Sequence, residues 1–331
     1  MPSSAPRYSL IILAGHGQAQ QRAGIASLAP LLASGHCEAL VMAHRGEADG
    51  LESLREILAE LGPRARLAPL PPCPAGAARN QGAEQARGEV LFFSQTDCLL
   101  PPDLEDRLEQ ALTPADRDGV GGLCRVANPD EPMARLLGLE LAWEHQVEHL
   151  PDALCAAYRR RDFLNSGGFD PADDAEGLEN YELAYRLLAQ GKELFWDPEL
   201  TVKRPLPSTW GGALALAYHL GRNRFHNLLQ RRRLGQGVPG GSRRFVQSLL
   251  VMLAVGFPLA LGGQDCQRAL TLAAICLLLL YPLNRGFIKT VAHQEPGLLN
   301  RTLVWCLLRP WAWTLGMIKA SLDRLGGGGG A

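Results

Sequence analysis

Two apolar runs without a charged residue lie in the last third of the chain. Phe245–Gln264 is long enough to cross a bilayer, and the shorter Ala269–Asn284 can cross if it is not tilted. The short polar segment Gly262–Gln267 joins them, so the pair predicts a membrane hairpin. The alternative is two buried helices of a soluble domain, although soluble helices of this length normally carry a polar stripe.

The charged residues are distributed very unevenly along the 331 residues. Residues 1–199 contain 17 basic and 31 acidic side chains, whereas residues 200–331 contain 16 basic and 3 acidic ones. This asymmetry indicates a soluble domain joined to a segment that lies on an anionic surface. The near-zero total, a net charge of −1, excludes a generally basic protein that coats nucleic acid.

The segments around the hairpin are basic and aromatic. An arginine-rich helix, expected over Trp210–Leu234, immediately precedes the hairpin, so anionic lipid or a lipid diphosphate is its expected partner. The apolar stretch Leu298–Lys319 is interrupted by two arginines and predicts an interfacial helix. Basic residues flank the hairpin on both sides and place its ends in the cytoplasm, at a cell inner membrane. They are Arg243, Arg244, Arg285 and Lys289.

The first two hundred residues alternate short apolar runs with helical patterns. Tyr8–Leu13, Ala39–Met42 and Val90–Phe93 are expected to form buried strands. Such alternation predicts an α/β domain with a parallel sheet, helices on both faces, and ligands at the carboxyl ends of the strands. The expected helices are Gln20–Ala33, Leu51–Leu61, Ala77–Arg87 and Asp103–Leu112.

Five segments carry recognisable short motifs, each weak alone but in a defined order. They are the opening strand Tyr8–Gly17, the helix Gly76–Glu89 with its Ala-Arg-Asn sequence, the segment Phe92–Asp103, the Arg-Arg and Gly-Gly-Phe-Asp pair in Tyr158–Asp170, and Leu178–Pro198. In this order they resemble the family 2 glycosyltransferases over about residues 8–205.

The resemblance implies a GT-A fold, a Rossmann-like nucleotide-diphospho-sugar transferase domain, followed here by C-terminal membrane helices. It also implies a nucleotide-sugar donor, a lipid-linked or glycan acceptor, and inversion at the transferred sugar. The expected division is 1–207 for the GT-A domain, 208–244 for a basic interfacial helix and linker, and 245–325 for the membrane hairpin with its interfacial helix.

Sugar transfer requires a cation that neutralises the leaving diphosphate, usually Mg²⁺ or Mn²⁺ held by a carboxylate. Asp97 is the one carboxylate expected at the carboxyl end of the Val90–Ser94 strand, so it is the candidate metal ligand. The alternative is an aspartate that opens a turn before Pro101. The candidate donor-binding residues are Arg79, Asn80, Gln95, Arg159 and Arg160, and buried structural contacts are a comparable role for Arg79 and Asn80.

The acceptor hydroxyl needs a base that removes its proton during attack on the sugar carbon. Glu179 and Glu182 lie three residues apart at an expected helix start, so both point to one face. The resemblance favours Glu179. The alternative is an acidic first turn that complements the helix dipole.

Three positions depart from the family pattern. Gln95 replaces the first aspartate of the D-x-D motif, and Asn180 replaces the aspartate that usually serves as base. Ala43–Gly46 replaces the acidic uridine contact. These changes motivate a second hypothesis, a catalytically silent GT-A module in a polysaccharide-assembly complex. A third is a peripheral lipid-binding protein.

Overall fold

The computed structural model describes residues 5–15, 18–44, 48–114, 117–148, 154–171, 179–233, 241–261 and 265–327. The chain forms two compact units. The first comprises residues 1–127 and 149–205, and the second comprises residues 128–148 and 206–331. Residues 128–148 thus belong to the second unit, although the segments before and after them in the chain belong to the first.

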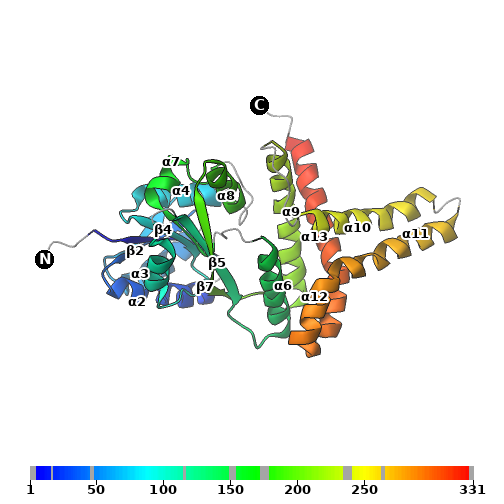
Figure 1. The fold of residues 1–331 in the computed structure, drawn as a ribbon, viewed down its shortest axis with the longest axis horizontal. Coiled ribbons are helices and arrows are strands. Elements are labelled where there is room, and N and C mark those ends of the chain that lie inside the picture. The colour runs from blue at the N-terminus through cyan, green and yellow to red at the C-terminus, as the bar shows by residue number, and fades with distance from the viewer. Residues whose placement is uncertain are drawn as a thin grey trace. The chain divides into compact units, whose positions relative to one another are not determined.

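The first unit is built on a seven-stranded sheet in the order β3-β2-β1-β4-β6-β5-β7 (Figure 1). All strands run in one direction except β6, which is antiparallel to both of its neighbours. The expected sheet is therefore confirmed, but it is mixed rather than purely parallel. The strands are β1 Tyr8–Leu13, β2 Cys37–Ala43, β3 Ala65–Pro69, β4 Val90–Gln95, β5 Arg117–Val126, β6 Ala156–Arg159 and β7 Glu193–Arg204.

Helices cover both faces of the sheet because its central strands are apolar on both sides. Every residue of β1, β2 and β4 is buried. One face packs against α1 Gln18–Ala26, α2 Ala29–Ala33, α3 Ala48–Ala59 and α5 Leu104–Leu112. The other packs against α4 Ala75–Gln85, α7 Arg160–Asn165 and α8 Glu179–Ala189. The single helix expected over Gln20–Ala33 is thus two helices, α1 and α2.

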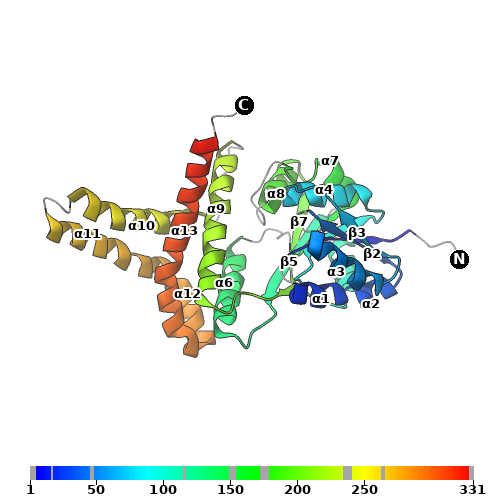
Figure 2. The same cartoon turned by 180° about the vertical axis from the view of Figure 1, so that it is seen from behind.

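The second unit is helical. Its helices α9 and α13 pack side by side (Figure 2), and glycines allow the close contact. A Cβ on Gly221 would overlap the Trp313 carbonyl oxygen, and one on Gly316 would overlap that of Tyr218. Small residues at such crossings let two helix backbones approach each other. The helices are α6 Pro132–Glu148, α9 Trp210–Arg233, α10 Gly241–Leu261, α11 Cys266–Leu278, α12 Leu280–Gln294 and α13 Leu299–Gly327, with the 3-10 turn Pro296–Leu298 before α13.

Helix α6 binds the apolar helices through buried ion pairs. Glu140 pairs with Arg309 of α13 and also accepts a hydrogen bond of 2.8 Å from Trp305 Nε1. Glu144 pairs with Arg244 of α10. Trp305 and Arg309 of α13 are therefore buried inside the unit.

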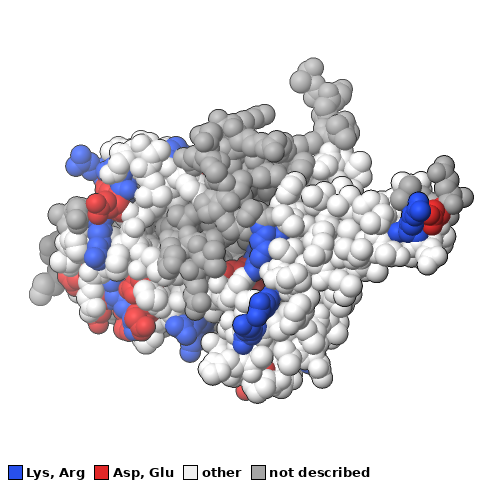
Figure 3. All heavy atoms as spheres, turned by 45° about the vertical axis from the view of Figure 1, so that its right-hand side comes forward, with Lys and Arg blue, Asp and Glu red and all other residues white. Residues whose placement is uncertain are grey.

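Helices α10 and α11 form an arm whose outer surface is apolar. Two stretches of the described residues are long and apolar enough to cross a membrane, Arg243–Ala260 and Cys266–Gln294, by length and composition alone. Leu259 and Leu278 are 82% and 72% exposed. Charged groups are sparse along the arm and gather near its end (Figure 3), where Arg268 pairs with Asp265 at 3.0 Å.

Candidate active site

The carboxyl ends of six strands, all except β6, meet at one edge of the sheet. Because β5 and β7 run parallel to β1, β2 and β4, the residues that follow Leu13, Ala43, Gln95, Val126 and Arg204 all lie at this edge. The loops are held together there, since the Gly15 amide donates to Thr96 Oγ1 at 2.9 Å. Ligands of such sheets bind at this edge. Gln95 and Asp97 are located here, as expected.

The carboxylate of Asp97 is paired with a residue that the sequence analysis did not single out. Arg204 Nε donates to Asp97 Oδ2 at 2.8 Å. The Asp97 side chain is 11% exposed and that of Arg204 is 34% exposed. The candidate metal ligand is therefore one half of a largely buried ion pair.

The surroundings of this pair favour the charged form of Arg204. Burial alone lowers the pKa of Arg204, but the neighbouring Asp97 carboxylate outweighs burial and raises it. Burial raises the pKa of the adjacent Cys98 thiol to about 12. Arg204 is therefore a permanent cation at the carboxyl edge, and Cys98 is a neutral thiol.

The observed arrangement does not fit a divalent cation at Asp97. One carboxylate oxygen already accepts from Arg204, and a cation bound beside it would lie within a few ångströms of a positive guanidinium. Two unit charges 4 Å apart near a protein surface repel by about 4 kcal/mol, and a divalent ion doubles that cost. In the described part of the chain, no group of three or more His, Cys, Asp and Glu side chains is arranged to hold a metal ion.

Asn80 and Arg79 lie in the first turns of α4 and contact the Gly-Gly-Phe-Asp segment. The Asn80 amide donates to the Phe169 carbonyl at 2.8 Å and accepts from the Phe169 amide at 2.9 Å. Gly168 has a positive φ of 67°, and a Cβ there would overlap Asn80 Oδ1. Arg79 is fully buried, with its guanidinium over the Phe169 ring. The Ala-Arg-Asn segment of α4 and the Gly-Gly-Phe-Asp segment are therefore joined by direct side-chain contacts.

Helix α8 begins at Glu179, as the sequence predicts. The Glu179 and Asn180 side chains lie outside the described residues. Glu182 is engaged, because Arg186 donates to its two oxygens at 2.9 and 2.6 Å and also to the Gly168 carbonyl at 2.6 Å. The carboxylate of Glu182 therefore positions an arginine that supports the Gly-Gly turn.

The loop after β2 contains the segment in which the acidic uridine contact is replaced. His44 is buried, and its Nδ1 lies 2.8 Å from the Cys73 carbonyl oxygen. Backbone bonds in the same place join Cys73 to His44 and Leu70 to Ala43. His44 thus ties this loop to the start of α4, while Arg45 and Gly46 lie outside the described residues.

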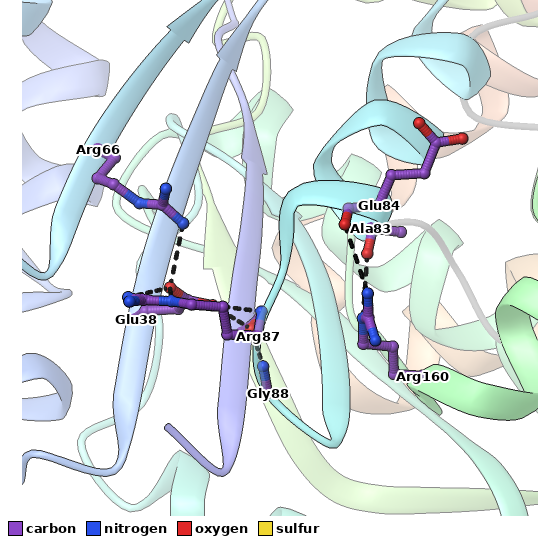
Figure 4. A network of polar contacts seen from close by, with 8 residues as sticks. Glu38, Arg66, Ala83, Glu84, Arg87, Gly88 and Arg160 are labelled. Carbon is purple, nitrogen blue, oxygen red and sulfur yellow. Dashed lines mark hydrogen bonds and ion pairs between the residues drawn. The ribbon is translucent and has the colours of Figure 1, made fainter. Parts of the chain in front are cut away.

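Arg159 and Arg160 lie at the opposite edge of the sheet. Arg159 is in register with Val90, the first residue of β4, because β6 is antiparallel. Its guanidinium donates to the carbonyls of Arg117 and Leu112 at 2.9 and 2.6 Å. Arg160 donates weakly to the carbonyls at the end of α4 (Figure 4). The expectation that they share a donor site with Asp97 is therefore corrected.

The same edge holds a buried carboxylate, Glu38 of β2, whose contacts with Arg66 and Arg87 are shown in Figure 4. Arg87 donates to it from its backbone amide at 2.7 Å and from its guanidinium at 2.8 and 2.7 Å. Ser9 Oγ and the Arg66 guanidinium also donate to the Glu38 carboxylate, at 2.8 and 3.2 Å. This network anchors the loop between α4 and β4 and lies away from the carboxyl edge.

The structure thus separates the predicted site residues into three groups. Gln95 and Asp97 share the carboxyl edge, and Arg79, Asn80 and Glu182 share the segment 166–170. Arg159 and Arg160 lie at the amino edge. Arg204 was missed because no motif or spacing relates it to Asp97, which lies 107 residues earlier in the chain.

Comparisons with known proteins give a fold likeness. No protein-family model and no curated protein sequence matches the chain. The solved structure of the mannosyltransferase PcManGT from Pyrobaculum calidifontis, in complex with GDP-Man and Mn²⁺, is similar with a TM-score of 0.58 and 16% sequence identity. The similarity covers 98% of this chain and 88% of that one. It shows the fold, and the expected class is confirmed: a GT-A-type α/β domain followed by apolar C-terminal helices.

Proposed function

We propose that this chain is a glycosyltransferase, which moves a sugar from a nucleotide-diphosphate sugar to a lipid-linked or glycan acceptor, with inversion at the sugar carbon. The observation that carries the proposal is the likeness to a mannosyltransferase over 98% of the chain. The carboxyl edge adds support, because it presents a buried acid and a cation where sheets of this kind bind ligands. Family 2 membership is part of the same proposal.

In this proposal the groups have separate tasks. The nucleotide diphosphate lies at the carboxyl edge beside Gln95 and Asp97, and Arg79 and Asn80 support the donor side through the Phe169 segment. Glu179 serves as the base that removes the acceptor proton. Glu182 is the weaker candidate, because Arg186 occupies both of its oxygens.

The proposal is tested with a panel of nucleotide sugars that starts with GDP-mannose, the donor printed for the similar structure. We expect one member to raise the melting temperature of the full-length protein in detergent and to be slowly hydrolysed. If no nucleotide sugar or nucleoside diphosphate binds, the chain is not a glycosyltransferase.

The same panel separates the silent-module hypothesis from the enzyme. Asn180 cannot accept a proton, and this substitution, together with Gln95, favours a module that binds donor without turnover. Donor binding with no product on any lipid or glycan acceptor, and turnover only after Asn180→Asp and Gln95→Asp are combined, would establish the silent module.

We further propose that the arm of α10 and α11 inserts into the cytoplasmic face of a bacterial-type inner membrane. Its apolar surface supports this, and the basic residues Arg243, Arg285 and Lys289 support the orientation. Arg244 no longer counts toward the orientation, because Glu144 neutralises it inside the helical unit.

The full-length protein is expected to stay with membranes after an alkaline carbonate wash. Leu259→Glu combined with Leu278→Glu should release it, because each change puts a carboxylate in place of an exposed leucine, and charged side chains are costly inside a bilayer. The matched control is Leu188→Glu, an exposed leucine of the first unit, which should leave fractionation unchanged. Full solubility of the parent protein without detergent would contradict the insertion.

A further inference from the structure

The position of Arg204 is determined by backbone hydrogen bonds on both sides of it. The preceding residue, Lys203, forms a bridge with Leu99 in which each amide donates to the other's carbonyl, at 2.7 and 3.0 Å. The Arg204 carbonyl accepts from the Ala127 amide at 2.8 Å. The first bond pair joins the end of β7 to the loop that contains Asp97. These backbone hydrogen bonds therefore hold Arg204, and with it the guanidinium, at the carboxyl edge of the sheet.

The guanidinium is only partly used by its partner. Nε donates to Asp97 Oδ2, and within the described residues it is the only nitrogen of this group that donates a hydrogen bond. A third of the Arg204 side chain is exposed, while Asp97 is largely buried beneath it. A planar guanidinium with Nε engaged still has its two terminal nitrogens for a second anion, and this fork geometry matches phosphate oxygens.

The charge balance at the carboxyl edge also supports anion binding by Arg204. Two carboxylates and one divalent cation sum to zero, and so do one carboxylate and one arginine. Gln95 removes one carboxylate from the motif, and Arg204 supplies one positive charge to the carboxylate that remains. The two differences therefore compensate each other electrostatically.

We propose that Arg204 binds the donor diphosphate in place of a divalent cation, so that this chain recognises nucleotide-diphosphate sugars without metal. The inference rests on the proposed function. In the transfer, the acceptor oxygen forms a bond to the sugar carbon while the bond from that carbon to the diphosphate oxygen breaks. The electron pair stays on the diphosphate, where Arg204 stabilises it, and the acceptor proton passes to the base. Asp97 holds the guanidinium in place.

The test is calorimetric titration of the full-length protein in detergent with GDP and with UDP, in excess EDTA and in MnCl₂. The nucleotide that binds is expected to have nearly the same Kd in both buffers. Arg204→Gln should weaken its binding about 10- to 100-fold in both, the range of one or two charge-assisted hydrogen bonds. Arg204→Lys should recover part of the loss, because it keeps the charge.

The matched control is Arg55→Gln, which removes an exposed arginine of α3 paired with exposed Glu52 and should leave nucleotide affinity unchanged. The double variant Gln95→Asp with Arg204→Gln restores the carboxylate pair and should bind nucleotide only with Mn²⁺. Thermal melting of each variant shows whether it is folded.

The outcomes separate the inference from the proposed function. Binding by the parent protein that requires Mn²⁺ and vanishes in EDTA would overturn the role of Arg204 while leaving a glycosyltransferase in place. An equal Kd for folded Arg204→Gln and the parent protein would also overturn it. If neither nucleotide and no nucleotide sugar binds in either buffer, the proposed function fails with the inference.

Discussion

Replacement of Glu179 by glutamine is expected to lower turnover by about 10²- to 10⁴-fold with little change in donor affinity. This is the usual contribution of a positioned base, and proton removal and donor binding are separate tasks. Glu179 and Glu182 occupy the first turn of α8, and Glu182 is held by Arg186 through both oxygens. Initial rates and donor Kd, measured for the same preparation, check the prediction.

The matched control is Glu182→Gln, one turn along the same helix. It releases Arg186 from the turn at Gly168, so we expect a lower melting temperature and an unchanged pH profile of kcat. Glu179→Gln should instead remove the acidic limb of that profile. Asn180→Asp should leave activity unchanged or raise it. A loss in Glu182→Gln that exceeds the loss in Glu179→Gln and alters the pH profile would reassign the base.

Replacement of Glu38 by glutamine is expected to lower the free energy of unfolding by about 3 kcal/mol. Breaking a buried charge pair costs about 3–5 kcal/mol, and the lower end applies because Arg87 and Arg66 regain water. Their side chains are 59% and 44% exposed, whereas Glu38 is fully buried. In Glu38→Gln, the side-chain NH₂ group also replaces a carboxylate oxygen that accepts hydrogen bonds from Arg87, so that two donors face each other. Urea unfolding of the full chain in detergent measures the change.

The stabilisation by Glu38 depends on pH with a definite sign. Burial raises the pKa of Glu38, but the hydrogen bonds from Arg87 and Ser9 outweigh burial and lower it below its ordinary value. A lowered folded-state pKa means that the stabilisation is present above the unfolded pKa, about 4.3, and is lost as the pH falls through the folded value. The parent protein and Glu38→Gln should therefore converge in acid.

The control for Glu38 is Glu52→Gln on α3, where both partners of the ion pair are exposed. An exposed pair contributes about 0–1 kcal/mol, so this variant should unfold almost like the parent protein. Equal losses for the two variants at neutral pH would show that the Glu38 network contributes no more than a surface pair.

The sequence predicted the elements that follow from local patterns. The apolar runs of β1, β2 and β4 are buried on both faces, so each appears in the sequence as a continuous block of apolar residues. Strand β3 was missed because it is short, half-exposed and ends in proline. Strand β6 was missed because it has only four residues, and its antiparallel direction depends on pairing rather than on composition.

Helix α6 illustrates the limit of composition. Its sequence lies between two strands of the first unit, yet its residues belong to the helical unit. Glu140 and Glu144 neutralise Arg309 and Arg244, which as sequence positions suggested charges at a membrane surface. Long-range ion pairs of this kind are set by which helices pack together, and no local spacing encodes them.

The sequence by itself determined the α/β class, the strand end that carries Gln95 and Asp97, and the two apolar helices, because each depends on residues close together in the chain. Only the tertiary structure decided which groups share a site. In that structure Arg159 and Arg160 lie at the amino edge, because β6 runs antiparallel to β4. It brought Arg204 to Asp97 across 107 residues, because parallel strands end at the same edge of a sheet.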